Sequence, residues 1–101
     1  MKIVIVGAGE VGRHVAKMLS NENHDITIMD ESEERLQDLD TNYDIMSRIG
    51  SPTSVNDLQM CGVRNCDLFI AVNTSESVNT TACMIASKLG ARKTVARIDN
   101  Y

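Results

Sequence analysis

The glycine-rich stretch at residues 7–12, with the sequence GAGEVG, constrains the fold of this chain more than any other feature. The five residues before it, KIVIV at 2–6, are mostly apolar and β-branched and predict a buried strand. The residues after it place apolar side chains at helical spacing and predict an amphipathic helix over 10–21. A Gly-x-Gly-x-x-Gly motif between a strand and a helix is the context that the dinucleotide-binding fingerprint requires.

Each glycine of the motif has a physical reason in such a turn. Gly7 permits the tight turn that leaves the strand, and Gly12 allows the helix and the strand to pack closely. Gly9 has no side chain, so a pyrophosphate can approach its backbone. The N–H groups at the start of the helix then face the phosphates, and the helix dipole favours their negative charge.

A second strand, expected over residues 25–29, is followed by Asp30, which lies 18 residues after Gly12. In the dinucleotide fingerprint an acidic residue follows the glycines by about 20 residues, where its carboxylate contacts the adenosine ribose. The alternative is that Asp30 only caps the helix that we expect to begin there. Because strand, glycines, helix, strand and acid occur in this order, nucleotide binding is the favoured interpretation.

Strands and helices alternate along the whole chain. Such alternation predicts parallel strands joined by right-handed crossovers. We therefore expect an α/β, Rossmann-like, doubly wound parallel sheet of order 3-2-1-4-5, with the nucleotide crevice between the first and fourth strands. The expected strands are 2–6, 25–29, 43–49, 67–73 and 94–98, of which 43–49 is expected at the edge of the sheet. The first and last expected helices are 10–21 and 74–89. Between them we expect one helix that begins at Asp30 and one that is capped by Ser51, with Pro52 as its first residue.

Composition argues against several partner classes. The net charge is −4 and no basic run occurs, so nucleic acid and anionic membrane surfaces are poor partners. No stretch approaches the ~18 apolar residues of a membrane span, and we expect no direct membrane insertion. The three cysteines are expected to be reduced thiols. We expect the core to be filled in part by Met18, Met46, Met60 and Met84.

Three segments beyond the glycines carry a more specific pattern. These are TIMD at 27–30, DLFIAV at 67–72 followed by Glu76 and Asn79, and ARI at 96–98 followed by Tyr101. Together with the opening residues they resemble the N-terminal nucleotide-binding domain, called RCK or KTN, of TrkA-type regulators of Trk potassium uptake. The family often has Gly-Asp after its third strand, where this chain has Gly50-Ser51.

The resemblance implies one nucleotide-binding domain over residues 1–101, expected to end after its fifth strand because the family's sixth strand and crossover helix do not follow. It implies a regulatory domain, not an enzyme, that binds NAD or NADH, with ATP or ADP as alternatives, and gates a transmembrane Trk-type potassium transporter. Such proteins are homo-oligomers at full length. They are cytoplasmic and reach the inner face of the plasma membrane through that transporter.

The residues expected at the nucleotide come from the glycine loop, from the acid and its neighbours, and from the ends of the last three strands. They are Gly7, Ala8, Gly9, Glu10, Val11, Gly12, Asp30, Glu31, Arg35, Gly50, Ser51, Asn73, Thr74, Ser75, Glu76, Asn79 and Arg97. Two of them have a second interpretation. The Glu10 side chain is expected to point toward solvent, and a charge at Arg97 is more often an ion pair than a ligand contact.

Two other functions stay open at this stage. An NAD-binding fragment of an oxidoreductase would carry the same glycines, but it needs a proton-handling residue and a substrate domain, and residues 73–76 offer no general base with a partner. A scaffold that has lost its ligand is the third possibility. The intact glycines and Asp30 argue against it.

Overall fold

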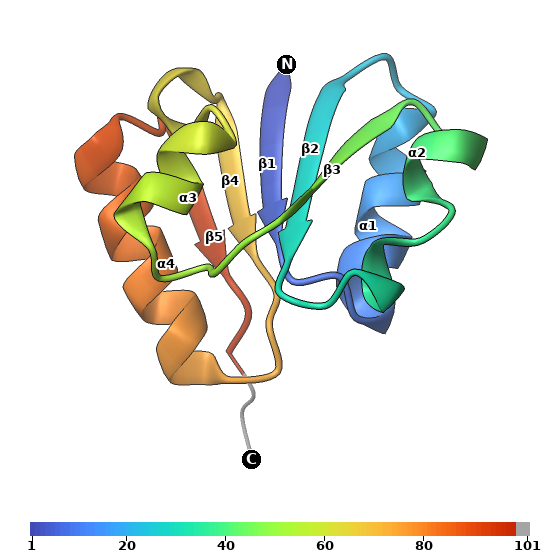
Figure 1. The fold of residues 1–101 in the computed structure, drawn as a ribbon. Coiled ribbons are helices and arrows are strands. Elements are labelled where there is room, and N and C mark those ends of the chain that lie inside the picture. The colour runs from blue at the N-terminus through green and yellow to red at the C-terminus, as the bar shows by residue number, and fades with distance from the viewer. Residues whose placement is uncertain (99–101) are drawn as a thin grey trace.

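The alternating strands and helices assemble into one parallel sheet with helices on both faces, as seen in the computed structural model, which describes residues 1–98 (Figure 1). The strand order is β3-β2-β1-β4-β5, which confirms the predicted topology. Tyr101, part of the family pattern, lies outside the described residues. The strands are β1 (Lys2–Val6), β2 (Asp25–Asp30), β3 (Ile45–Ile49), β4 (Leu68–Ala71) and β5 (Thr94–Ala96).

The helices divide between the two faces of the sheet. In Figure 1, α1 and α2 cover one face, and α3 and α4 cover the other. Alternate residues of β1 serve the two layers, because side chains of a strand point to opposite faces in turn. Ile3 and Ile5 belong to one apolar cluster, and Val4 and Val6 to the other. The helical elements are α1 (Glu10–Ser20), α2 (Leu39–Asn42), α3 (Val55–Met60) and α4 (Glu76–Leu89), with 3-10 turns η1 (Glu34–Leu36) and η2 (Val63–Asn65).

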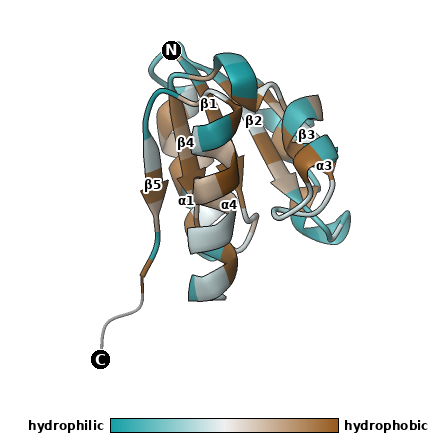
Figure 2. Cartoon of the chain, turned by 90° about the vertical axis from the view of Figure 1, so that its left-hand side faces the viewer, coloured by the Kyte–Doolittle hydropathy of each residue, from teal (hydrophilic) through white to brown (hydrophobic). Residues whose placement is uncertain are grey.

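The core combines the strands, on which hydrophobic residues gather in Figure 2, with the inward-facing residues of the helices and turns. All three cysteines are free and buried, and burial raises the pKa of the Cys61 thiol to about 11. The four methionines expected in the core are instead 50 to 62% exposed, so that prediction is wrong. Helical spacing identifies residues that share a face, but only packing decides which face is covered. Within residues 1–98, no helix combines the length and the apolar composition that crossing a membrane requires.

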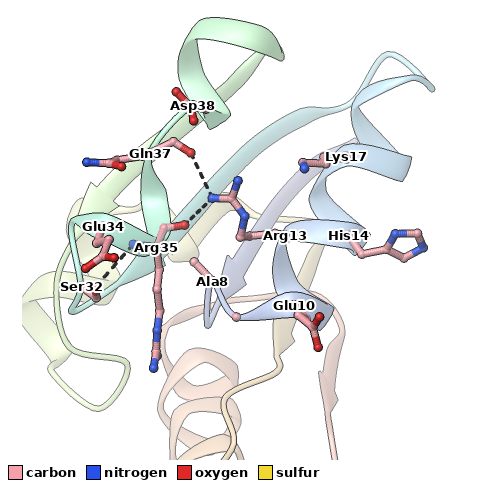
Figure 3. Close-up of a pocket in the computed structure, with 11 residues that line it drawn as sticks. Ala8, Glu10, Arg13, His14, Lys17, Ser32, Glu34, Arg35, Gln37 and Asp38 are labelled. Carbon is pink, nitrogen blue, oxygen red and sulfur yellow. Dashed lines mark hydrogen bonds between the residues drawn. The ribbon is translucent and has the colours of Figure 1, made fainter.

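The segment after β2 differs from the predicted helix. It contains only the 3-10 turn η1 and the short helix α2, separated by Asp38 in a left-handed conformation with φ of 69°. The Arg13 guanidinium of α1 donates to the carbonyl oxygens of Arg35 and Gln37 (Figure 3). In a continuous helix these carbonyls would accept from amides four residues further on. A contact from a distant helix therefore replaces the local hydrogen bonds of a regular helix.

The third helix begins later than predicted. Its cap is Ser54, whose hydroxyl oxygen accepts from the backbone N–H of Asp57 at 3.2 Å, so α3 starts at Val55. The expected cap, Ser51, instead donates its backbone N–H to the Asp57 carboxylate at 2.9 Å. Serine occurs at both positions 51 and 54, so residue type alone does not identify the cap. The hydrogen bond to the Asp57 carboxylate holds Ser51 in the turn that precedes the helix. The fourth helix, expected over 74–89, is α4 at Glu76–Leu89, with Ser75 as its cap.

Candidate functional site

The order in which strands are added to the sheet reverses between the adjacent parallel strands β1 and β4. From β1 the chain proceeds toward β2 and β3, and from β4 it proceeds toward β5, so the loops that leave these two adjacent strands diverge. In open α/β sheets this switch point forms the ligand crevice at the carboxyl ends of the strands. A cleft of about 260 Å³ lies there, lined by Gly7, Gly9, Glu10, Val11, Asp30, Arg35, Val72, Asn73, Thr74 and Arg97.

The glycine loop is shaped by two close backbone contacts. Gly7 has φ of 108°, and a Cβ there would lie 2.9 Å from the backbone nitrogen of Asn73. A Cβ on Gly12 would lie 1.7 Å from the Gly7 carbonyl oxygen. These contacts agree with the roles predicted for the first and third glycines, a tight turn and close helix–strand packing. A Cβ on Gly9 would meet nothing within 4 Å, so the second glycine leaves open space on the cleft side.

The helix that opens on the cleft has no side-chain cap. Gly9 is the N-cap of α1 and makes no side-chain hydrogen bond, whereas Ser54 and Ser75 cap α3 and α4. The first N–H groups of a helix have no intrahelical partners. At α1 they are therefore available for an anion, and the helix dipole adds favourable electrostatics.

Asp30 connects the end of β2 to the glycine loop. Its side chain is only 5% exposed, and one carboxylate oxygen accepts from the backbone N–H of Ala8 at 2.8 Å. The other oxygen accepts from the N–H of Ser32, also at 2.8 Å. An ionised carboxylate has about four acceptor positions, so two remain for further donors. Asp30 thus holds the loop in shape and keeps acceptor capacity for a ligand, and it caps no helix.

Arg35 stands where three cavities meet. It is 59% exposed, and its guanidinium lies 3.8 Å from the Asp30 carboxylate. It lines the central cleft, a cavity of about 780 Å³ beside α1 and one of about 380 Å³ beside Pro52. In Figure 3 its side chain extends past Ser32, whereas His14 points away from the other labelled residues. Arg35 thus borders all three cavities while its guanidinium faces the Asp30 carboxylate.

Most of the predicted site residues are brought together at these cavities. The lining includes Gly7, Ala8, Gly9, Glu10, Val11, Asp30, Glu31, Arg35, Asn73, Thr74 and Arg97. Gly12 lies buried beneath the loop, and Glu10 is exposed as expected. Arg97 borders the cleft and also has an interaction partner within the protein.

Besides Gly12, five predicted residues do not line these cavities. Ser75 and Glu76 belong to the cap and first turn of α4, and Asn79 is buried with its amide bonded to the backbone. Gly50 and Ser51 are turned toward α3, because Asp57 packs beside Gly50 and binds the Ser51 N–H. The family resemblance and the position of the fourth strand's end predicted these residues at the crevice. In the structure, Ser51 and Asn79 are engaged in hydrogen bonds within the protein.

Ten residues that line these three cavities were not predicted from the sequence: Arg13, His14, Lys17, Met29, Ser32, Glu34, Gln37, Asp38, Pro52 and Val72. Ser32 had a usable signal, since a residue two positions after an aspartate often donates its N–H to that side chain. Pro52 and Val72 had none, because a loop proline and a strand-end valine are equally common in a packed core.

The switch-point cleft, the uncapped helix and the buried acid define a Rossmann-type domain of the nucleotide-binding class. Residues 3–101 match the TrkA-N domain family. The chain belongs to this family. It is 40% identical to the Trk system potassium uptake protein TrkA of Haemophilus influenzae, over 99% of this chain and 22% of that protein. The chain thus spans about a fifth of the length of this relative and of the TrkA proteins of Halomonas elongata and Vibrio alginolyticus.

Solved structures show the same fold at low sequence identity. The Kef CTD of Shewanella denitrificans, described in its AMP-bound form, superposes with a TM-score of 0.79 at 18% identity over 94% of this chain and 57% of that one. The NAD(P)-binding domain of an exopolyphosphatase-related protein from Archaeoglobus fulgidus gives 0.82 at 13% identity, over 97% and 73%. At these identities the likeness establishes the fold.

Proposed function

We propose that this domain binds an adenine nucleotide, NAD or NADH in the first place, and regulates a Trk-type potassium uptake system. The observation that carries the proposal is the uncapped N-terminus of α1 at Gly9, beside the buried carboxylate of Asp30, in a cleft at the switch point. The helix end suits the pyrophosphate, and the carboxylate suits the ribose hydroxyls. ATP and ADP share the same adenosine and phosphates and are the alternative ligands.

The two halves of the cleft suit the two halves of a dinucleotide. Asp30 and the glycine loop lie on the β1–β2 side, and Asn73, Thr74 and Arg97 lie across the cleft at the ends of β4 and β5. A mononucleotide bound through ribose and phosphate needs only the first side. The group beyond the pyrophosphate reaches the second side, which is where NAD and NADH, or ATP and ADP, differ. Titration calorimetry with these four ligands tests the proposal directly, and absence of binding would contradict it.

Discrimination against NADP is the first expected result. Asp30 and Glu31 place two carboxylates where a 2′-phosphate would sit, and the nearby Arg35 is already within 3.8 Å of Asp30. We expect NADP to bind at least about tenfold more weakly than NAD, which is ~1.4 kcal/mol. Calorimetric titration of both cofactors at one ionic strength measures the ratio. Equal dissociation constants would show that the ribose does not contact these acids.

The regulatory part of the proposal rests on the family and on the named function of the relatives. Potassium uptake proteins called TrkA match nearly all of this chain. We propose that the full-length protein is a cytoplasmic homo-oligomer that docks on the inner face of the membrane through a transmembrane Trk-type transporter. Its ligands then act by binding two arrangements of the complex with different affinities. The role is regulatory and not catalytic.

The full-length protein is expected to co-purify with such a transporter in mild detergent, and NAD or NADH should change the strength of that association. Pull-down from membranes with and without each nucleotide measures both effects. Loss of the association under all conditions would contradict the assigned partner. Turnover of NADH by the isolated domain with small carbonyl substrates would instead indicate an oxidoreductase.

A further inference from the structure

Asn79 is a buried polar residue that the proposed nucleotide contacts do not use. It lies in the first turns of α4, is 1% exposed, and makes three hydrogen bonds to backbone groups. Its carbonyl oxygen accepts from the N–H of Asn73 at 2.7 Å. Its amide nitrogen donates to the carbonyl oxygen of Asn73 at 2.8 Å and to that of Arg97 at 3.1 Å. One acceptor and two donors are thus matched to one N–H and two carbonyls.

These bonds occur where the β4–β5 ladder ends. The last paired residues are Ala71 and Ala96, and the last backbone bond runs from the N–H of Arg97 to the carbonyl of Ala71. Within residues 1–98, no backbone hydrogen bond between the two strands follows this one. The Asn79 amide takes the place of the ladder and ties the exits of β4 and β5 to α4.

The two residues that the amide holds both line the cleft. Asn73 and Arg97 form part of its β4–β5 wall, opposite Asp30 and the glycine loop. Asn79 itself does not reach the cleft. We infer that Asn79 is a positioning residue, which fixes the far wall of the cleft and thereby sets the preference for a dinucleotide over a mononucleotide. This inference rests on the proposed nucleotide function and adds to it a residue that controls selectivity.

Two substitutions separate this role from general stability. Asn79→Leu keeps the approximate shape and removes all three bonds, and Asn79→Asp keeps the acceptor for the Asn73 N–H and loses the donors. Ala86→Gly, at a buried position near the other end of α4, is the matched control that weakens the same helix with the Asn79 bonds intact. Asp30→Ala is the control for the near wall, since it should weaken every adenine nucleotide alike.

The probes are NAD, which spans both walls, and AMP, which is confined to the near wall. In the Asn79 variants the dissociation constant for NAD should rise about tenfold or more, while that for AMP changes by about twofold or less. Ala86→Gly should leave the ratio of the two constants at its wild-type value, because partial unfolding weakens both ligands by the same factor. Equal losses for NAD and AMP in the Asn79 variants would overturn the inference.

Hydrogen exchange on the wild-type chain provides a second test that needs no variant. NAD should slow exchange at the Asn73 amide more than AMP does at equal saturation, because only NAD contacts the wall that Asn79 holds. Equal slowing by both nucleotides would overturn the inference. If neither nucleotide binds the wild type, the proposed function and the selectivity role both fail. Ligand-free protection of the Asn73 amide, lost in Asn79→Leu and kept in Ala86→Gly, would then show that the contact is structural only.

Discussion

Replacement of Gly12 by alanine is expected to cost the domain about 3 kcal/mol or more of its free energy of unfolding. The added Cβ would lie 1.7 Å from the carbonyl oxygen of Gly7 and 2.8 Å from its carbonyl carbon. Both are backbone atoms, so no side chain can rotate away, and α1 must move off β1. That movement disturbs the apolar cluster to which Ala16 of the same helix contributes.

Thermal unfolding followed by circular dichroism measures this effect. For a domain of this size a loss of ~3 kcal/mol lowers the melting temperature by roughly 12 °C or more. Gly9→Ala is the matched control, because its Cβ meets nothing within 4 Å. It should cost about 1 kcal/mol or less, the usual difference between glycine and alanine at an N-cap. Similar losses for the two variants would show that α1 does not pack as closely on β1 as described.

The substitution Gly9→Val is expected to weaken nucleotide binding strongly while leaving the fold nearly unchanged. Gly9 has φ of −75° and ψ of −166°, which a valine can adopt, and it borders the cleft. The branched side chain would fill the space in which the pyrophosphate must approach the N-terminus of α1. We expect nucleotide affinity to fall about a hundredfold or more, ~2.7 kcal/mol, with a small change in thermal stability.

Calorimetry with NAD and AMP tests this expectation, since both ligands carry a phosphate at the loop. Gly9→Ala should give an intermediate loss, because its single methyl group intrudes less. Normal binding by Gly9→Val would mean that the nucleotide site lies elsewhere. Together these variants test whether Gly12 serves the packing of α1 on β1 and Gly9 serves the binding of the ligand.

The sequence by itself determined the architecture of this protein. Strand periodicity, the GAGEVG turn and the spacing to Asp30 depend on local rules, and the observed sheet order and the contacts of Gly7 and Gly12 agree with them. Each of these features needs only information within one βαβ unit. Right-handed crossovers then leave few topologies for five parallel strands.

Tertiary structure alone decided the details of the site. The predicted second helix is replaced by η1 and α2, and there the Arg35 carbonyl accepts from Arg13, 22 residues away in the chain; no local pattern signals such a contact. The family resemblance predicted Asn79 as a ligand contact, whereas its side-chain amide binds backbone groups at the ends of β4 and β5. The physical reason is the same in both cases. Polar side chains bind whichever unpaired backbone groups the folded chain brings to them, and which groups remain unpaired is known only after the sheet has formed.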